Sequence, residues 1–167
     1  LDSGILKLDL VVYPSPQAYD AAVERFGALP PERHLRIGGM KVYLDGSPQG
    51  RPAWMREPYA GEADYRGYPT LTDEQVYQRV RMAGERHMQL LAHCNGDRAA
   101  QQYLDALERA AEEGKCPPRP VMIHAQLLDR DQLEQVKKLG VIPSFFVAHV
   151  YHWGDIHVKN FGLTRAE

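Results

Sequence analysis

Four stretches of the sequence place a residue that can bind a metal or move a proton beside a short apolar run. Lys41 lies in KVYLDGS, close to Asp45, and the other three stretches carry His93, His124 and His149. Each apolar run is typical of a β-strand, so these side chains are expected near strand ends. Ligand sites of parallel α/β folds lie at the carboxyl ends of strands. The residue types therefore predict a metal site.

The spacing of the histidines indicates one shared site. His93, His124 and His149 follow one another at intervals of about one strand–helix unit. Neighbouring parallel strands lie about 4.8 Å apart, so two imidazoles at one height can reach the same zinc ion through bonds of ~2.0–2.1 Å. A single strand-end histidine is more often structural, and we give that role to four others: His34, His87, His152 and His157.

Two interpretations of Lys41 are open. The residue stands between Met40 and Val42, where burial of a charged amine costs free energy. In one interpretation the side chain reaches water or pairs with Asp45. In the other, the amine reacts with CO₂ to form a carbamate, a carboxylate-like group that bridges two metals.

Hydrophobic periodicity predicts alternating strands and helices. Strands are expected over 4–13, 35–44, 88–93, 120–124 and 141–148, and helices over 17–26, 72–87, 97–114 and 129–140. Thr72, Asp97 and Asp129 are the expected N-caps of the last three helices. This order indicates an α/β fold with parallel strands and helices outside them. The aperiodic segment 45–68 is long enough to indicate a functional loop.

Composition excludes several classes of protein. The 167 residues carry a net charge of −2, with 44% hydrophobic and 25% charged residues, as in ordinary globular domains. This balance argues against a nucleic-acid partner. No apolar run approaches the ~20 residues of a membrane helix, so we expect no membrane contact and a cytoplasmic location. An upstream signal peptide is left open, because the chain begins at Leu1. Cys94 and Cys116 are expected to be reduced.

Three runs, in order along the chain, resemble a known family. They are GGMKVYLDGSPQGRPAWMREPY, LLAHCNGDRAAQQYLDALE and IHAQLLDRDQLEQVKKLGVIPSF. Together they are similar to the amidohydrolase superfamily, and more narrowly to its YtcJ-like branch, amidohydrolase family 3. Some members of that branch are named exoenzyme regulatory protein, and others are deformylases of N-substituted formamides. The resemblance covers nearly the whole chain.

The resemblance implies a partial TIM-like (β/α)8 barrel and a metal centre. Residues 1–167 would be a single segment carrying about strands three to seven, without strands one and eight and without the family's β-sandwich. A divalent metal, expected to be zinc, would be bound as one or two ions in the full-length enzyme by Lys41 (as a carbamate), His93 and His124. The positions expected to contact a small-molecule substrate are Asp45, Arg51, Tyr59 and His149.

The sequence also departs from the family pattern. The paired His-x-His of strand one and the Asp of strand eight, the usual general base, are absent, so the catalytic residue is unknown. A full barrel usually needs ~250 residues. We therefore expect a fragment of an enzyme that hydrolyses an amide or formamide C–N bond with metal-activated water. The fragment itself is expected to be inactive and to self-associate through its open barrel edges.

A fold of alternating strands and helices is also compatible with two other functions. A non-catalytic regulatory or binding protein can share the fold, because a fold does not fix function. A phosphate-binding protein is disfavoured, since no GxxxxGK[ST] loop is present and GGMK falls inside a predicted strand. The loop aromatics Trp54, Tyr59, Tyr65 and Tyr68 indicate either an apolar substrate group or packing of the loop onto the barrel.

Overall fold

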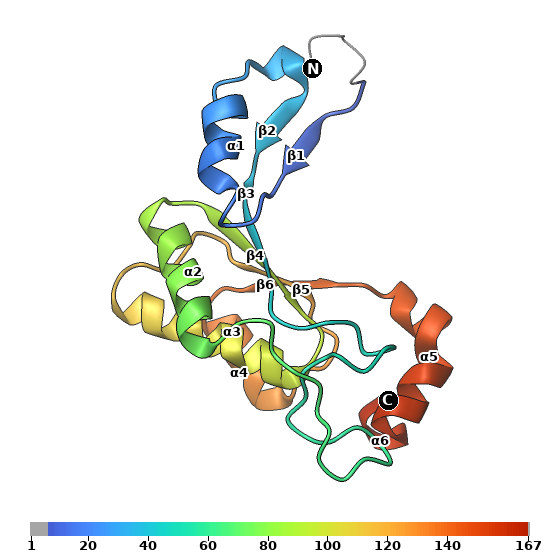
Figure 1. Ribbon diagram of the computed structural model, residues 1–167. Coiled ribbons are helices and arrows are strands. Elements are labelled where there is room, and N and C mark those ends of the chain that lie inside the picture. The colour runs from blue at the N-terminus through green and yellow to red at the C-terminus, as the bar shows by residue number, and fades with distance from the viewer. Residues whose placement is uncertain (1–6, 167) are drawn as a thin grey trace.

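In the computed structural model, which describes residues 7–166, strands and helices alternate along the chain (Figure 1). The strands are Leu10–Val12 (β1), Leu35–Ile37 (β2), Gly39–Tyr43 (β3), Gln89–Cys94 (β4), Val121–His124 (β5) and Ile142–Phe145 (β6). The helices are Tyr19–Phe26 (α1), Asp73–Glu85 (α2), Asp97–Glu112 (α3), Arg130–Lys138 (α4), Ala148–Phe161 (α5) and Leu163–Ala166 (α6), with a 3₁₀ turn at Pro31–Arg33. Residues 4–6 of the first expected strand lie outside the described residues.

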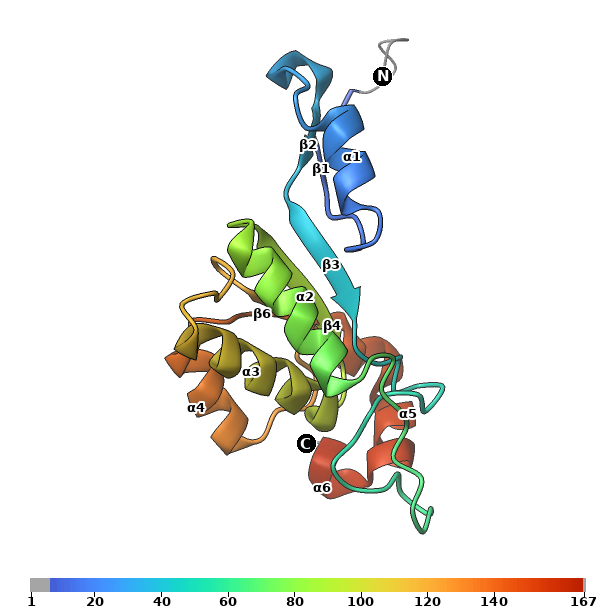
Figure 2. The same cartoon turned by 60° about the vertical axis from the view of Figure 1, so that its left-hand side comes forward.

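The central element is a parallel sheet of four strands in the order β3-β4-β5-β6. In its register Tyr43 pairs with His93, and His93 pairs with Ile123. Helices α2, α3 and α4 cover one face of this sheet, while α5 and α6 lie apart from that helical layer (Figures 1 and 2). The parallel order places the carboxyl ends of all four strands at one edge, as the alternation predicted.

The hydrophobic core lies between the sheet and helices α2 and α3. Along β4 every second residue is buried, so Leu90, Ala92 and Cys94 face the helices while Leu91 and His93 face the opposite side. Side chains of this core include Met40, Leu104 and Met122, all with no exposed surface. Burial of each large apolar side chain contributes roughly 1.5–3 kcal/mol. The core therefore fixes which face of each strand is free to carry chemistry.

Two of the three predicted helix caps are confirmed. Thr72 caps α2, with its hydroxyl accepting from the Gln75 N–H and the Gln75 side chain accepting from the Thr72 N–H. Asp129 makes the same reciprocal pattern in front of α4. The prediction for Asp97 was wrong by one residue, because Gly96 is the N-cap of α3. The Asp97 carboxylate instead accepts hydrogen bonds from the backbone N–H groups of Arg56 and Arg98.

The single strand expected over 35–44 is two strands. The chain is interrupted at Gly38, so β2 pairs with β1 in a separate two-stranded sheet and β3 begins the four-stranded one. The Gly38 N–H donates to the Val12 carbonyl at 2.9 Å, and the Lys41 N–H donates to Pro14 at 3.0 Å. Figure 1 shows β1, β2 and α1 projecting from the rest of the molecule.

The last expected strand, 141–148, is also shorter in the structure. Strand β6 stops at Phe145, and α5 begins at Ala148. His149 therefore lies in the first turn of a helix and not directly after a strand. A short apolar run does not by itself distinguish a strand from a helix, and here it contains the end of one and the start of the other.

Large apolar side chains are exposed where β6 passes into α5. Val147, Val150 and Tyr151 are 81%, 77% and 88% exposed, and Phe145 is 58% exposed. Strand β6 is also an outer strand of its sheet. An apolar surface next to an unpaired strand edge is typical of a protein interface.

Among residues 7–166, no helix is long and apolar enough to cross a membrane.

Gly96 provides a test of how the long loop packs onto β4. A Cβ atom at Gly96 would lie 1.9 Å from the Trp54 carbonyl oxygen, whereas a Cβ at Gly154 in α5 would meet no atom within 4 Å. We expect Gly96→Ala to lower the free energy of unfolding by about 1–3 kcal/mol through overpacking. Gly154→Ala should raise it by about 0.4–1 kcal/mol. Urea denaturation measures both, and equal effects of the two substitutions would contradict the packing.

Candidate functional site

His93 and His124 lie together at the carboxyl ends of β4 and β5. Their ring centroids are 4.6 Å apart in a T-shaped arrangement. By register His124 pairs with Cys94, whose side chain faces the helices. Strand alternation alone would send His124 to that face too, but positive φ angles at His124 (73°) and Ala125 (47°) break the alternation. Such backbone costs ~1–3 kcal/mol per residue and is concentrated at functional sites.

Lys41 lies on the same face of the sheet as His93, but at a level two residues before it, because Lys41 pairs with Leu91. It is the third of the five residues of β3, and Tyr43, not Lys41, is the direct neighbour of His93. Lys41 therefore lies near the carboxyl end of its strand, two residues before the last one. Its Nζ lies 4.8 Å from the centroid of the Tyr43 ring, which is itself 5.3 Å from the centroid of the His93 ring. The structure thus brings Lys41, His93 and His124 into one group.

Both imidazoles are held in the neutral form at neutral pH. Burial lowers the pKa of His93 to about 4, and the nearby charges of His124 and Lys41 act in the same direction. Burial also lowers the pKa of His124, with His149 and Lys41 adding to the shift. Neutral imidazole is the form that binds a metal. The environment of the pair therefore suits metal ligation.

Asn95, which the sequence reasoning did not single out, orients His93. Its Nδ2 lies 2.9 Å from Nε2 of His93 and donates to the Gly46 carbonyl at 3.0 Å. The His93 ring also hydrogen-bonds the backbone of Gly46. Asn95 therefore limits rotation of the His93 ring. The only feature of the sequence that pointed to Asn95 was its position two residues after His93, a histidine at a predicted strand end.

Asp45 is a buried anchor of the long loop. Its carboxylate accepts from the backbone N–H groups of Trp54, Asn95 and Gly96 at 3.0, 3.0 and 2.7 Å. The side chain has no exposed surface, and Oδ1 lies 3.8 Å from Nε2 of His93. Burial raises the pKa of the carboxyl to about 6, even though the three N–H donors act the other way. These contacts give Asp45 a structural role, and its contact with substrate stays a prediction.

Arg51 and Tyr59 make their visible contacts within the same loop. Tyr59 is 1% exposed and its hydroxyl donates to the Ala53 carbonyl at 2.8 Å. The Arg51 guanidinium lies over the Tyr59 ring and pairs with Glu62 at 2.7 Å. Tyr59 also packs against Tyr65 and Phe161. These contacts pack the loop, and the contact of Arg51 and Tyr59 with substrate stays a prediction.

His149 belongs to a row of rings that starts at His93 and His124. Its ring is stacked on His124 at 5.4 Å and lies edge-on to His157 at 6.0 Å. Burial lowers the pKa of His149 and His157. His157, which the sequence analysis treated as structural, is only 6% exposed and stacks on Phe161. The row borders a cavity of about 340 Å³ that His124, Gln126, His149 and His157 help to line.

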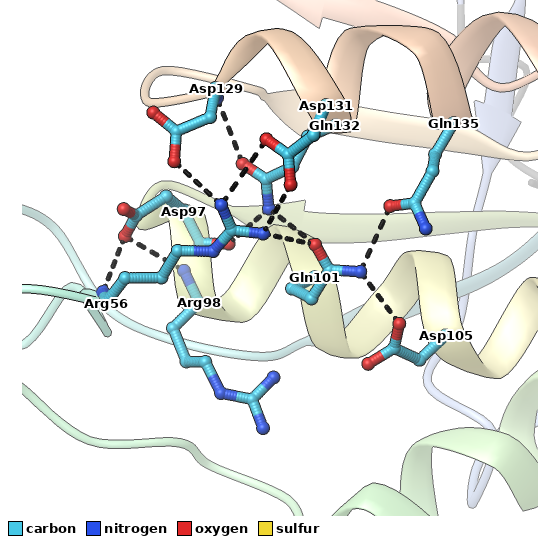
Figure 3. A network of polar contacts seen from close by, with 9 residues as sticks. All are labelled: Arg56, Asp97, Arg98, Gln101, Asp105, Asp129, Asp131, Gln132 and Gln135. Atoms are coloured by element: carbon cyan, nitrogen blue, oxygen red, sulfur yellow. Dashed lines mark hydrogen bonds and ion pairs between the residues drawn. The ribbon is translucent and has the colours of Figure 1, made fainter.

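Arg56 fastens the long loop to the helices that follow β4 and β5 (Figure 3). Its guanidinium pairs with Asp129 at 2.7 Å and Asp131 at 3.2 Å, both at the start of α4, and donates to Gln101 of α3. Its backbone N–H donates to Asp97 at 2.8 Å. The two helices begin shortly after His93 and His124. The network therefore limits how far the two strand ends can move apart.

A complete metal site of common ligands is not present in the described chain. Among residues 7–166, no group of three or more His, Cys, Asp or Glu side chains is placed to hold a metal. Cys94 is a free, fully buried thiol facing the helices, as predicted. The candidate ligands are therefore two imidazoles and one amine. Nδ1 of His124 is buried and has no hydrogen-bond partner, which leaves a donor atom available in that group.

Comparison with known proteins identifies the family. The sequence profile described as "Amidohydrolase family" matches residues 4–166. The chain belongs to this family. It is 30% identical over 123 residues to the Bacillus subtilis (strain 168) protein named "Putative amidohydrolase YtcJ", covering 72% of this chain and 23% of that protein. It is 28% identical over 133 residues to "Protein LONG AFTER FAR-RED 3" of Arabidopsis thaliana, covering 79% and 23%.

Two crystal structures have the same fold as this chain. Both are described as uncharacterized metal-dependent hydrolases, from Pyrococcus furiosus (TM-score 0.82, 30% identity) and Pyrococcus horikoshii OT3 (TM-score 0.81, 26% identity). Each covers 98% of this chain, which spans 34% and 32% of theirs. The chain is thus a segment of a partial TIM-type barrel, with the parallel strands and outer helices expected from the sequence.

The buried carboxyl of Asp45 predicts an unusual pH dependence. Its pKa in the folded chain, about 6, lies above the ordinary value of 3.8, so its stabilising contribution is complete below pH 3.8 and is lost as pH rises through 6. The stability difference between the native chain and Asp45→Asn should therefore shrink by up to about 3 kcal/mol from pH 4 to pH 7. Urea denaturation at several pH values measures this difference. A difference that grows with pH would contradict it.

Proposed function

We propose that this chain supplies about half of the active site of a metal-dependent enzyme that hydrolyses the C–N bond of an amide or formamide. The observation that carries the proposal is the group of Lys41, His93 and His124 at the carboxyl ends of parallel strands. Family membership and the two hydrolase structures support the reaction class. The chain would act as one segment of a barrel domain.

The residues fit a divalent metal as part of a ligand set. The ring centroids of His93 and His124 lie 4.6 Å apart, and the buried Nδ1 of His124 has no hydrogen-bond partner within residues 7–166. Zinc is favoured because two imidazoles are ligands it commonly takes. A bound metal would activate water and polarise the substrate carbonyl. Lys41, whose charge already acts on both histidines, would join as a carbamate once it has reacted with CO₂.

The protein groups have distinct tasks in this proposal. His93 and His124 bind the metal, Asn95 fixes the orientation of His93, and Asp45 holds the loop against the end of β4. Further ligands and the general base would come from parts of a longer protein. With three donors the isolated chain would bind one ion weakly and remain inactive. Asp45, Arg51, Tyr59 and His149 are kept as proposed substrate-side residues, and the ring of His149 stacks on that of His124 at 5.4 Å.

A binding or regulatory protein on the same fold is the second candidate. The observation that favours it is the lack, within residues 7–166, of three clustered His, Cys, Asp or Glu side chains. Metal affinity and turnover in the longer protein distinguish the two candidates. A protein that binds no metal at Lys41, His93 and His124 would favour the second.

The metal proposal is tested by titrating the chain with Zn²⁺ against a chromophoric chelator. We expect His93→Ala and His124→Ala each to weaken Zn²⁺ binding at least about tenfold, the scale of loss seen even for outer-shell partners. His152→Ala removes an exposed imidazole of α5 and is the matched control. With ¹³C-bicarbonate, a carbamate signal should appear in the native chain and be absent in Lys41→Ala. Unchanged Zn²⁺ affinity in both histidine variants would rule out this centre.

We also propose that the isolated chain self-associates through the β6 edge and the exposed side chains of α5. Tyr151→Glu places a charge in this surface and should shift the association equilibrium by about tenfold, since about 1.4 kcal/mol corresponds to that factor. Gln78→Glu, on the exposed face of α2, adds the same charge elsewhere and should have no effect. Sedimentation velocity over a range of concentrations measures this. A native chain that stays monomeric throughout would contradict the proposal.

A further inference from the structure

Two dipeptides, Asp45–Gly46 and Asn95–Gly96, bind each other just beyond the ends of β3 and β4. They are the only Asp–Gly and Asn–Gly pairs in the sequence. We propose that Asn95–Gly96 is a deamidation site that the Asp45 carboxylate keeps unreactive, and that opening of the long loop starts the reaction. This covalent modification requires neither a bound metal nor a substrate, so it goes beyond the proposed function.

Deamidation of an Asn–Gly pair is an intramolecular reaction. The backbone nitrogen of Gly96 loses its proton to a base in the solvent and attacks Cγ of Asn95. The new N–Cγ bond closes a five-membered succinimide ring, and the side-chain nitrogen takes up a proton and leaves as ammonia. Water then opens the ring at either carbonyl, which yields aspartate or isoaspartate. Glycine has no Cβ to obstruct the attack, so Asn–Gly pairs are reactive wherever the backbone is free to turn.

The Asp45 carboxylate holds the attacking nitrogen in place. Its two oxygens accept the consecutive N–H groups of Asn95 and Gly96 at 3.0 and 2.7 Å. Because one carboxylate receives both groups, it fixes the rotation of the backbone between them, which is the ψ angle of Asn95. Ring closure needs this rotation to bring the Gly96 nitrogen to Cγ. The Asp45 side chain has no exposed surface, so water does not compete for these bonds.

The group under attack is held by other partners. Nδ2 of Asn95 donates to the Gly46 carbonyl at 3.0 Å and lies 2.9 Å from Nε2 of His93. The backbone carbonyl of Asn95 accepts from the Leu127 N–H at 3.2 Å. Asn95 is only 2% exposed, which keeps solvent bases away from the dipeptide. The two atoms that must form the new bond are therefore fixed separately while the loop is in place.

The long loop controls access to this pair through Trp54. The Trp54 N–H donates to the same Asp45 carboxylate at 3.0 Å, and its carbonyl accepts from the N–H groups of Arg98 and Ala99 at the start of α3. Opening of the loop would withdraw Trp54, admit water to the carboxylate and free the Gly96 nitrogen. Loops open locally at a lower free energy than the whole chain unfolds. Loop opening is therefore the expected trigger.

The product could not restore the original contacts. In aspartate or isoaspartate at this position an oxygen replaces Nδ2 of Asn95, and it would face the Gly46 carbonyl oxygen without a hydrogen between them. A carboxylate buried without donors is unfavourable. Isoaspartate also adds one atom to the backbone of the turn. Deamidation would thus detach the start of the loop from the end of β4 irreversibly.

The test measures deamidation of Asn95 in the native chain and in Asp45→Ala by mass spectrometry. Alanine is used because asparagine would create a second Asn–Gly pair. Both proteins are incubated at neutral pH in H₂¹⁸O, which labels the carboxyl formed on ring opening, and the tryptic peptide 87–98, whose one asparagine is Asn95, is analysed. We expect Asp45→Ala to react at least about tenfold faster, because loss of the charged acceptor raises the population of the open loop.

Asp105→Ala makes the same substitution on the exposed side of α3 and should leave the rate at the native value. The native chain is also measured in the urea concentration that lowers its free energy of unfolding to that of Asp45→Ala, and the variant should still react faster. A rate in Asp45→Ala equal to or below that of the native chain at matched stability would overturn the inference.

If Asp45→Ala does not fold, a urea series on the native chain decides. Deamidation of Asn95 should accelerate below the urea concentrations that unfold the chain, in step with hydrogen exchange of the Gly96 N–H. Deamidation that begins only with global unfolding would overturn the inference.

Discussion

The Asp45 carboxylate is the interaction on which the rest of the site depends. Three backbone N–H groups, from Trp54, Asn95 and Gly96, converge on its two oxygens, so one buried side chain joins the start of the long loop, its middle and the end of β4. A buried carboxylate is costly unless its oxygens are satisfied, and here the backbone satisfies them. The turn that follows His93 is fixed as a result, and Asn95 is placed to orient the imidazole.

A second constraint acts on the two strand ends together. Arg56 binds the starts of α3 and α4, and the Ala125 and Leu127 N–H groups donate to the Cys94 and Asn95 carbonyls. The segments after β4 and β5 are therefore joined both directly and through the loop. The two imidazoles therefore lie at strand ends that are joined to each other and to α3 and α4. On the other side of the site lie the cavity and the exposed apolar side chains of β6 and α5.

Much of the fold followed from local patterns in the sequence. The capping boxes at Thr72 and Asp129, the helices α2, α3 and α4 and the strand–helix alternation were correctly predicted because caps and periodicity are local properties. The break at Gly38 and the end of β6 at Phe145 were missed, because strand pairing is decided by distant segments. His157 and Gln126 were missed for the same reason, since their proximity arises only when α5 packs near the segment after β5.

The sequence by itself determined the family, the order of the elements and the identity of the candidate ligands, since these depend on residue type and spacing. Only the tertiary structure decided how those ligands meet. Lys41 lies on the same face of the sheet as His93, two residues before the end of its strand, and His124 lies beside His93 through a positive φ that no sequence pattern predicts. The tertiary structure also decided the structural role of Asp45, because the sequence of a loop does not show which backbone N–H groups the fold will bring to its carboxylate.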